Sequence, residues 1–345
     1  MNELNNGLID LKNYKIPLYR GFNLQSKVYK KGVKYSESDF ETMAEWGFNF
    51  IRLPLSYWVY GNRENWFEIN ENEMKDIDQA IELGRQYKIH INLNLHRIPG
   101  YCVNRRDLEP YDLFSDDAIE RNMAMEGAVY HWKFFADRYK GISNDRLSFD
   151  LINEPPFMKS EDAYIVVIKD LIEAIRSVDE TRLIFVDGID IGQTPVMGLK
   201  YPGIVQSTRG YQPKAVTHYT ANWVPKNEYE TFAPPSWPLK DDSGRLWNRE
   251  LLKSVYIDSW KPLTDTGVQV HVGEWGCFNR TPHDVALAWM SDCLSLWKEA
   301  GWGYSMWEFR GAFGILDSGR HDVKYEDYKG YKLDRKMLEL LKSFM

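Results

Sequence analysis

Short apolar runs recur along this chain, and most of them are bounded by Gly, Pro or Asn. Runs of this kind are typical of parallel strands that are buried on both faces. The eight runs cover residues 18–24, 48–55, 90–97, 147–154, 183–188, 215–219, 268–275 and 303–309. Amphipathic helical patterns lie between most of them, over residues 40–47, 71–87, 118–139, 161–178, 283–300 and 334–344. Eight strands that alternate with helices predict an α/β fold, the (β/α)8 TIM barrel.

A single barrel accounts for the length of the chain. No repeat, low-complexity segment or Ser/Gly linker interrupts its 345 residues, so we expect one (β/α)8 domain over residues 1–345. Two connections are longer than a minimal barrel needs, one over 97–117 after the third predicted strand and one over 220–267 after the sixth. Because both follow a strand, both should lie at the C-terminal face, where barrel enzymes carry their active sites.

Composition and charge exclude several classes of protein. The net charge of −7 argues against a nucleic-acid partner. The three cysteines form neither a disulfide framework nor a CxxC metal motif. The first residues lack an apolar signal-peptide core, and no apolar stretch approaches the roughly 18 residues of a membrane helix. We expect a monomer without a membrane partner, cytoplasmic as the sequence stands or secreted if a signal was removed.

Polar and aromatic side chains stand at or next to the ends of most predicted strands. In a barrel the carboxyl ends of all strands meet around one bowl, so side chains from distant segments should converge there. The candidates are Asn23, Arg52, His96, Asn153, Glu154, Asp187, His218, Tyr219, Glu274, Trp275, Trp307 and Glu308.

Glu154 and Glu274 end the fourth and seventh predicted strands, 120 residues apart. Glycoside hydrolysis needs two carboxyl groups, one to protonate the leaving oxygen and one to attack the anomeric carbon or to activate water. A separation of roughly 5–5.5 Å gives retention of configuration, and roughly 6.5–9.5 Å gives inversion. Strands four and seven face each other across the barrel mouth, which favours the shorter distance. Pro155 disfavours the helical region for Glu154, so we expect an extended turn there.

The neighbouring candidates suit the same chemistry. Arg52 is always cationic and would keep one carboxylate ionised, as a nucleophile requires. Asn153 can bond a sugar 2-hydroxyl. His96 and His218 can donate to hydroxyls, and the flat apolar faces of Trp275 and Trp307 can stack on sugar rings. Asn23 is expected to bind substrate in the same bowl.

Other chemistries fit the sequence less well. His96, His218 and Glu274 could converge on a metal, but the His-any-His pair that is usual in metal-dependent barrel hydrolases is absent. The GxSxG elbow of serine hydrolases and the glycine-rich phosphate loops are also absent. We therefore expect no metal and no cofactor. A barrel that binds carbohydrate without cleaving it is the alternative from another class, and the presence of both glutamates argues against it.

Six motifs in order carry a resemblance to a known family. They are FNFIRLPL with Arg52, NLHRIPGY with His96, Asn153-Glu154-Pro155, VTHY with His218, VGEWG with Glu274 and SMWEF with Trp307. From Leu18 to the C-terminus the chain resembles glycoside hydrolase family 5, the cellulase family of retaining (β/α)8 glycosidases. By this resemblance Glu154 is the general acid/base, Glu274 the nucleophile and Arg52 its partner.

The resemblance also assigns the surrounding residues. It makes Asn153 the contact to the 2-hydroxyl, His96 and His218 residues of the glycone site, and Trp307 its aromatic floor, followed by a cis peptide bond to Glu308. The family usually has His-any-Tyr after strand six, with the tyrosine bonded to the nucleophile. Here Tyr219 directly follows His218, which leaves its role open. We expect Glu308 to bind a sugar hydroxyl.

The resulting hypothesis is a retaining hydrolase of β-glucan that forms a covalent glycosyl–enzyme intermediate, as an endo-β-1,4-glucanase does. A β-mannanase, an exo-acting β-glucosidase or a β-1,3-glucanase would use the same residues. The partner is then a β-linked polysaccharide or oligosaccharide.

Overall fold

The computed structural model describes residue 11, residues 14–224 and residues 233–345. Of the domain predicted over 1–345, residues 1–10 and 12–13 and part of the predicted loop, 225–232, therefore lie outside the described residues. Within the described segments, no helix combines the length and the apolar content that crossing a lipid bilayer requires.

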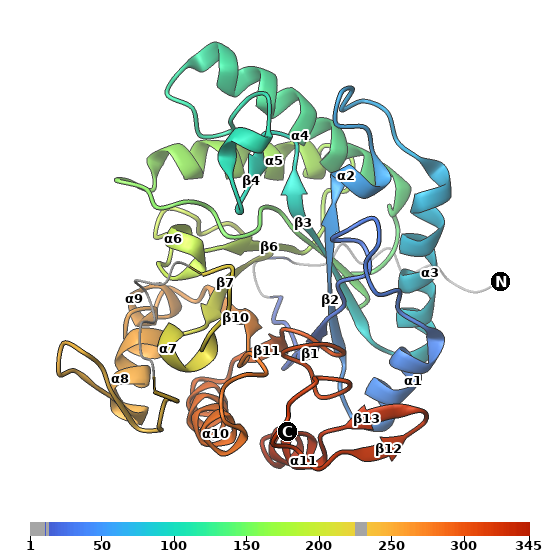
Figure 1. Cartoon of the computed structure of the whole chain (residues 1–345). Helices are drawn as coiled ribbons and strands as arrows, with labels where there is room; N and C mark the ends of the chain where they lie inside the picture. The colour runs from blue at the N-terminus through green and yellow to red at the C-terminus, as the bar shows by residue number, and fades with distance from the viewer. Residues whose placement is uncertain (1–10, 12–13, 225–232) are drawn as a thin grey trace.

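Eight parallel strands form a closed barrel, which confirms the predicted (β/α)8 fold (Figure 1). Each strand pairs in parallel with the next one, and β1 also pairs with β11, so that the eight strands close into a ring. The barrel strands are β1 (Arg20–Asn23), β2 (Phe50–Ser56), β3 (His90–Ile98), β5 (Leu147–Asp150), β6 (Ile184–Asp187), β7 (Ile204–Gly210), β10 (Gln269–Trp275) and β11 (Gly303–Met306).

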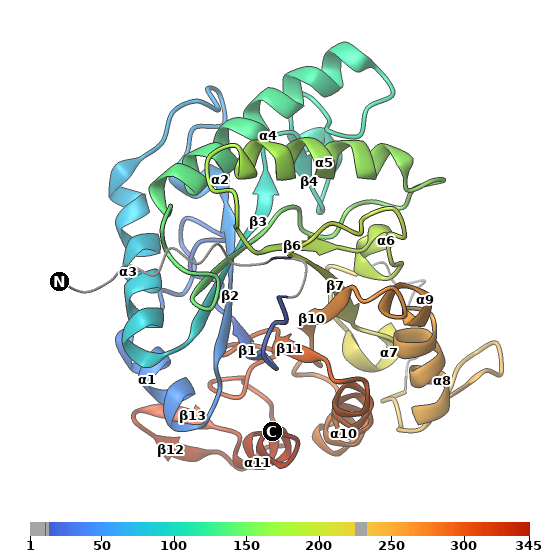
Figure 2. The ribbon, with the colours of Figure 1, turned by 180° about the vertical axis from the view of Figure 1, so that it is seen from behind.

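Helices surround the barrel, as both views of the molecule show (Figures 1 and 2). The six long helices confirm the six predicted ones within a few residues at each end. They are α1 (Glu37–Glu45), α3 (Glu71–Tyr87), α4 (Ala118–Arg138), α5 (Asp162–Arg176), α10 (His283–Ala300) and α11 (Arg335–Ser343). Helices α4 and α5 pack side by side on one flank, and α10 and α11 lie on the opposite flank.

Shorter elements lie in the connections. The short helices are α2 (Tyr57–Tyr60), α6 (Ile189–Gly192), α7 (Lys214–Thr217), α8 (Arg249–Lys253) and α9 (Lys261–Thr264), with the 3-10 turn η1 (Arg106–Leu108) and the π-helical turn η3 (Ser254–Asp258). Strand β4 (Tyr101–Cys102) pairs antiparallel with the end of β3. Two hairpins are formed by β8 (Leu239–Lys240) with β9 (Leu246–Trp247), and by β12 (Glu326–Tyr328) with β13 (Tyr331–Leu333).

The sixth barrel strand is β7, and the prediction that residues 215–219 form this strand is wrong. Most of that segment belongs to α7. The sequence pattern misses β7 because its central residues Gln206, Ser207 and Thr208 are polar, although all three are buried. A buried polar group is tolerated when it is hydrogen-bonded. The Gln206 amide meets this condition, because it bonds both the N–H and the C=O of Val196, at 2.9 and 2.7 Å.

Candidate active site

A pocket of about 570 Å³ opens at the carboxyl ends of the barrel strands. Its lining brings together six of the predicted site residues, which are His96, Glu154, His218, Glu274, Trp307 and Glu308. The structure adds polar and aromatic residues that the sequence reasoning did not single out as site residues, among them Gln25, Arg97, Arg209, Tyr211, Trp223 and Phe313. The predicted convergence of distant strand ends on one bowl is therefore observed.

Strand β10 is irregular just before Glu274. The pairing of β10 with β7 shifts between Val272 and Glu274, which leaves Gly273 as a bulge. Only glycine fits there, because a Cβ atom at this position would collide with the side chains of Ser207 and Arg209. Bulges change the direction in which the following side chain points. This one sets the direction of Glu274 at the rim of the barrel.

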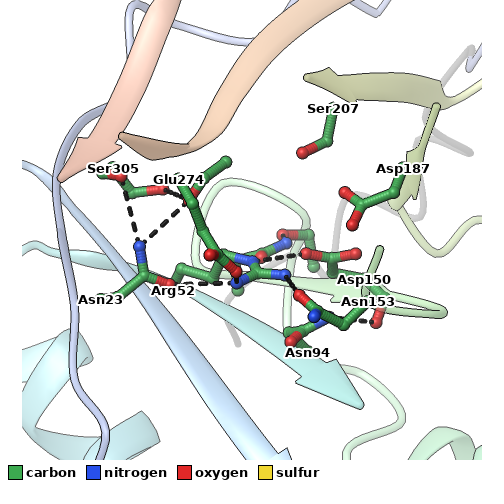
Figure 3. Close-up of polar contacts among 12 residues, drawn as sticks. Asn23, Arg52, Asn94, Asp150, Asn153, Asp187, Ser207, Glu274 and Ser305 are labelled. Atoms are coloured by element: carbon green, nitrogen blue, oxygen red, sulfur yellow. Dashed lines mark hydrogen bonds and ion pairs between the residues drawn. The ribbon is translucent and has the colours of Figure 1, made fainter. Parts of the chain in front are cut away.

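Arg52 lies beneath the pocket and contacts four other side chains (Figure 3). Its Nε donates to Asp150 at 2.7 Å, and its Nη1 donates to Oε1 of Glu274 at 2.6 Å and to Asn23 at 3.1 Å. Its Nη2 donates to Oδ1 of Asn153 at 2.8 Å. A planar guanidinium with every nitrogen occupied cannot rotate freely, so this network fixes the orientation of the Glu274 carboxylate.

Glu154 has a left-handed backbone with a φ of 49°, so the expectation of an extended turn is wrong. This conformation is unfavourable for a residue with a side chain by about 1–2 kcal/mol. Two hydrogen bonds offset the strain. The N–H of Glu154 donates to Oδ2 of Asp187 at 2.8 Å, and the Tyr101 hydroxyl donates to the Glu154 carbonyl at 2.6 Å. Pro155 does exclude the right-handed helical region, as expected, but the chain takes a third conformation.

Arg209 of β7 touches both glutamates. Its Nε donates to Oε1 of Glu154 at 3.1 Å, and its Nη2 lies 3.5 Å from Oε1 of Glu274. The same guanidinium pairs with Asp187 through both terminal nitrogens. The sequence reasoning missed Arg209 because it placed the sixth strand too late. Gly203 and Gly210, which bracket the run IVQSTR, were the available signal.

The burial of these acids changes their proton affinity. Burial, and next the charge of Glu274, raise the pKa of Glu154 to about 7. Burial also raises the pKa of Asp150 to about 7, although Arg52 opposes that change. Together with Glu308, which lines the same pocket, three carboxyl groups of the site have pKa values raised to about 7. Burial has the opposite effect on the pKa values of the histidines near the pocket. It lowers the pKa of His218 to about 4 and that of His96 well below its usual value. Both histidines are neutral at pH 7.

Tyr211 is bonded to Glu274, and this resolves the open question about Tyr219. The Tyr211 hydroxyl donates to Oε2 of Glu274 at 3.3 Å. Arg209, Gly210 and Tyr211 lie at the end of β7, the sixth barrel strand. This Arg-Gly-Tyr sequence stands where the family resemblance implied His-any-Tyr. Tyr219 instead lines a neighbouring hollow beside Phe278 and is not among the residues that line the main pocket, so its contact with substrate stays a prediction. His218 does reach the pocket, with its ring edge-on to Tyr211 at 5.1 Å.

Trp307 stacks on His96, with ring centroids 5.6 Å apart and an interplanar angle of 17°. The peptide bond from Trp307 to Glu308 is cis, as the resemblance implied. Glu308 accepts a hydrogen bond from Gln25, and burial raises the pKa of Glu308 to about 7. Glu308 lines the pocket. With a pKa of about 7 it can be protonated or ionised at neutral pH, so it can donate a hydrogen bond to a hydroxyl group or accept one from it.

Two predicted substrate contacts are contradicted. Trp275 is fully buried and packs edge-on against Trp297, at 4.6 Å between centroids. Neighbouring residues of a strand point to opposite faces, so Trp275 must face the helices if Glu274 faces the pocket. Asn23 is also fully buried, and its amide donates to the carbonyls of Gly273 and Ser305 at 3.0 and 3.2 Å. Asn23 therefore holds Arg52 and the barrel strands rather than substrate.

Asn153 lies just below the pocket, fully buried. Its Oδ1 accepts from both Arg52 and Arg209, at 2.8 and 3.0 Å. Its Nδ2 has no hydrogen-bond partner within the described residues. Because Asn153 is fully buried and does not line the pocket, its contact with a sugar 2-hydroxyl stays a prediction. Within the same residues, no group of three or more His, Cys, Asp and Glu side chains is arranged to hold a metal ion.

The family model described as cellulase, glycosyl hydrolase family 5, matches residues 11–312. The chain belongs to glycoside hydrolase family 5. This family 5 member is therefore a glycoside hydrolase, an enzyme that acts on O-glycosyl bonds.

Curated relatives of this family 5 hydrolase cover most of its length. Endoglucanase C of Acetivibrio thermocellus is 25% identical over 313 residues, which are 84% of this chain and 89% of the relative. Cellodextrinase A of Ruminococcus flavefaciens is 24% identical over 274 residues, which are 77% of this chain and 75% of the relative.

Solved structures agree with the barrel. A crystal structure described as a glycoside hydrolase is 40% identical, with a TM-score of 0.87 over 94% of this chain and 99% of its own. The structure of Thermotoga maritima Cel5A with cellobiose is 20% identical, with a TM-score of 0.75 over 94% of this chain and 96% of its own. At that identity the second likeness supports the fold of this family 5 hydrolase alone.

Proposed function

We propose that this hydrolase cleaves β-1,4-glucan as an endo-acting, retaining glycosidase, and that residues 1–345 form one catalytic domain. The observation that carries the proposal is the pair Glu154 and Glu274, which share one pocket and one guanidinium, that of Arg209. The two carboxyls sit in different surroundings. Glu154 has a pKa raised to about 7, whereas Glu274 is paired with Arg52 at 2.6 Å. Unlike surroundings suit an acid and a nucleophile.

The proposed reaction has two steps. First, the Glu274 carboxylate attacks the anomeric carbon, the glycosidic C–O bond breaks, and the Glu154 proton passes to the leaving oxygen. The glycosyl group is then an ester of Glu274. Second, water attacks the same carbon, the ester bond breaks, and the Glu154 carboxylate takes the proton of the water. Both carboxyls return to their starting states, and the product keeps the β configuration.

The surroundings of the pair support a sugar in the pocket. Trp307 and His96 are stacked at its wall, and the neutral imidazole of His96 can donate to or accept from a hydroxyl. Trp223 lines the pocket with about half of its surface exposed, which leaves an aromatic platform for a further sugar unit. The names of the relatives, endoglucanase and cellodextrinase, support β-1,4-glucan or its short fragments as the substrate class.

A hydrolysis panel with product analysis tests this function. We expect cellulose, mixed-linkage glucan or cello-oligosaccharides to be cleaved faster than mannan, β-1,3-glucan and xyloglucan, with products of several lengths. Proton NMR of the first product should show the β-anomer, and a 2-deoxy-2-fluoro glycoside should label Glu274, as peptide mass spectrometry can verify. Glu274→Gln should abolish hydrolysis. Glu109→Gln is the matched control, because Glu109 is a buried carboxyl outside the pocket.

Two results would argue against the proposal. An α-anomer as the first product would mean inversion and no covalent intermediate. Faster cleavage of mannan or of β-1,3-glucan would move the substrate class to one of the alternatives while leaving the role of the two glutamates intact.

A further inference from the structure

Asp187 and Arg209 form a buried ion pair next to Glu154. The Asp187 side chain is fully buried, and the Arg209 side chain is 2% exposed. Nη1 of Arg209 donates to Oδ1 of Asp187 at 3.0 Å, and Nη2 donates to Oδ2. Two parallel hydrogen bonds between a guanidinium and a carboxylate fix the relative orientation of both groups. The two opposite charges lie within one contact distance, so the pair has no net charge.

This pair holds Glu154 at two points. Oδ2 of Asp187 accepts the backbone N–H of Glu154 at 2.8 Å, and Nε of Arg209 donates to the carboxyl Oε1 at 3.1 Å. The first bond supports the left-handed backbone of Glu154, and the second fixes the direction of its side chain. Neither residue has to touch substrate to act in this way.

The charge of Arg209 alone would work against a proton donor. A cation within about 4–6 Å lowers the pKa of a carboxyl by about 1–3 units, which would leave it without a proton at neutral pH. Asp187 acts in the opposite direction and raises the pKa of Glu154, so Arg209 can supply its hydrogen bond while part of its lowering effect is offset. Burial raises the pKa of Glu154 to about 7 in spite of the contact. The charged and titratable groups that act on Glu154 are Tyr101, Asp187, Arg209, Tyr211 and Glu274. Arg52 and Asp150 lie one contact further away, because Arg52 bonds both Glu274 and Asp150.

We propose that Asp187 and Arg209 are positioning residues that orient the Glu154 carboxyl, with the Asp187 charge offsetting that of Arg209 so that Glu154 keeps the proton it donates. The proposal rests on the function proposed above, because it matters for catalysis only if Glu154 is the acid. It predicts a specific asymmetry. Removing only the negative charge of Asp187 should lower the pKa of Glu154. Removing both charges should largely restore that pKa.

The first test measures Glu154 directly, without activity. The variants are Asp187→Asn, the double variant Asp187→Asn with Arg209→Gln, and the control Asp179→Asn. Asp179 also accepts two hydrogen bonds from a buried arginine, Arg182, both of them at Oδ2, and neither residue lines the pocket. Carboxyl 13C NMR of protein labelled at glutamate, assigned with Glu154→Gln, gives the pKa of Glu154. We expect Asp187→Asn to lower it by at least about 1 unit, and the double variant to return it toward the wild-type value.

The second test uses two β-cellobiosides with different leaving groups. A 3,4-dimethylphenyl group needs protonation to depart, whereas a 2,4-dinitrophenyl group does not. For the dimethylphenyl substrate, Asp187→Asn should move the alkaline limb of the pH profile of kcat/KM to lower pH. The size of this movement should equal the pKa change of Glu154 measured by NMR. At pH 7 the rate should fall about 5-fold or more, because a pKa lowered by one unit leaves about one tenth of the acid protonated. The dinitrophenyl substrate should change little, and Asp179→Asn should change neither.

The outcomes separate this inference from the proposed function. If Asp187→Asn leaves the Glu154 pKa within about 0.3 units of wild type, or if the double variant lowers it further, the inference is overturned. If the wild-type enzyme hydrolyses no β-glucoside, the proposed function fails, and the NMR titrations still decide whether the pair controls Glu154. Should the double variant not fold, the comparison of Asp187→Asn with Asp179→Asn alone decides the question.

Discussion

Arg52 and Glu274 are 222 residues apart in sequence and meet in a 2.6 Å ion pair beneath the pocket. Their side chains are 1% and 5% exposed. A buried pair of this kind contributes little net stability, but losing one partner leaves an uncompensated charge. The pair therefore acts mainly by fixing the position of the Glu274 carboxylate. The closure of the barrel between β1, β2 and β11 keeps the two side chains in place.

Arg52→Lys should lower kcat/KM by about 100-fold or more. A lysine ammonium cannot reach Asp150, Glu274 and Asn153 together, and each lost charge-assisted bond is worth about 1.5–3 kcal/mol. Steady-state kinetics on an aryl β-cellobioside measures the effect. Circular dichroism should show a folded barrel, since the charge is kept. Activity at the wild-type level would show that orientation by Arg52 is dispensable.

Tyr211→Phe and Tyr219→Phe form a matched pair. Of the two tyrosines, Tyr211 is the one that donates to Glu274, so its loss should slow the reaction by about 10-fold, as expected for one hydrogen bond to a charged group. Tyr219 lines another hollow, and Tyr219→Phe should keep kcat/KM within about 2-fold of the wild-type value. The reverse ranking would restore Tyr219 as the partner of the nucleophile.

Substitution of Trp307 should change the kinetics, whereas substitution of Trp275 should change the stability. Trp307→Ala should raise KM and lower kcat with a small change in Tm, because its ring lines the pocket. Trp275→Ala should lower the free energy of unfolding by about 3–5 kcal/mol, because it leaves a cavity against Trp297. Urea unfolding and steady-state kinetics on both variants check this. A KM effect without loss of stability in the Trp275 variant would contradict its placement.

Gly311 is expected to protect the position of Glu308. Gly311 has a φ of 127°, and a Cβ atom there would collide with the Glu308 carboxyl. Gly311→Ala should therefore raise KM several-fold. Gly330→Ala is the control, since Gly330 also has a positive φ, of 84°, but has open space around it. We expect both variants to lose about 1 kcal/mol of stability, and only the first to lose substrate affinity.

The Glu154 and Glu308 carboxyls should each contribute stability that is lost as the pH rises from about 4.5 to 7. The pKa values of Glu154 and Glu308 are raised to about 7, so these groups bind more protons in the folded state than in the unfolded state within this window. The contribution of these two carboxyls therefore decreases with pH and levels off above 7. The buried His96 and His218 have lowered pKa values and contribute in the opposite direction, so a variant is needed to isolate the effect of Glu154. Glu154→Gln should match wild type near pH 4.5 and be more stable by up to about 3 kcal/mol at pH 8. Urea unfolding at several pH values measures this, and an equal gain at both pH values would contradict it.

The sequence pattern predicted most of the fold for local reasons. Runs such as HINLNLHR and residues 71–87 carry their own periodicity, so β3 and α3 could be recognised without their neighbours. Strand β7 could not, because its polar residues are acceptable only through partners such as Val196, which tertiary folding supplies. The placement of Trp275 could have been corrected from strand alternation alone, since Glu274 precedes it.

By itself the sequence determined the alternation of strands and helices and the presence of two strand-end glutamates, Glu154 and Glu274, because both are local properties of the chain. Only the tertiary structure decided which groups surround them. Arg209 reaches Glu154 across 55 residues and Tyr211 reaches Glu274 across 63. Contacts of this kind depend on the register of neighbouring strands and on a bulge at Gly273, which no local pattern encodes.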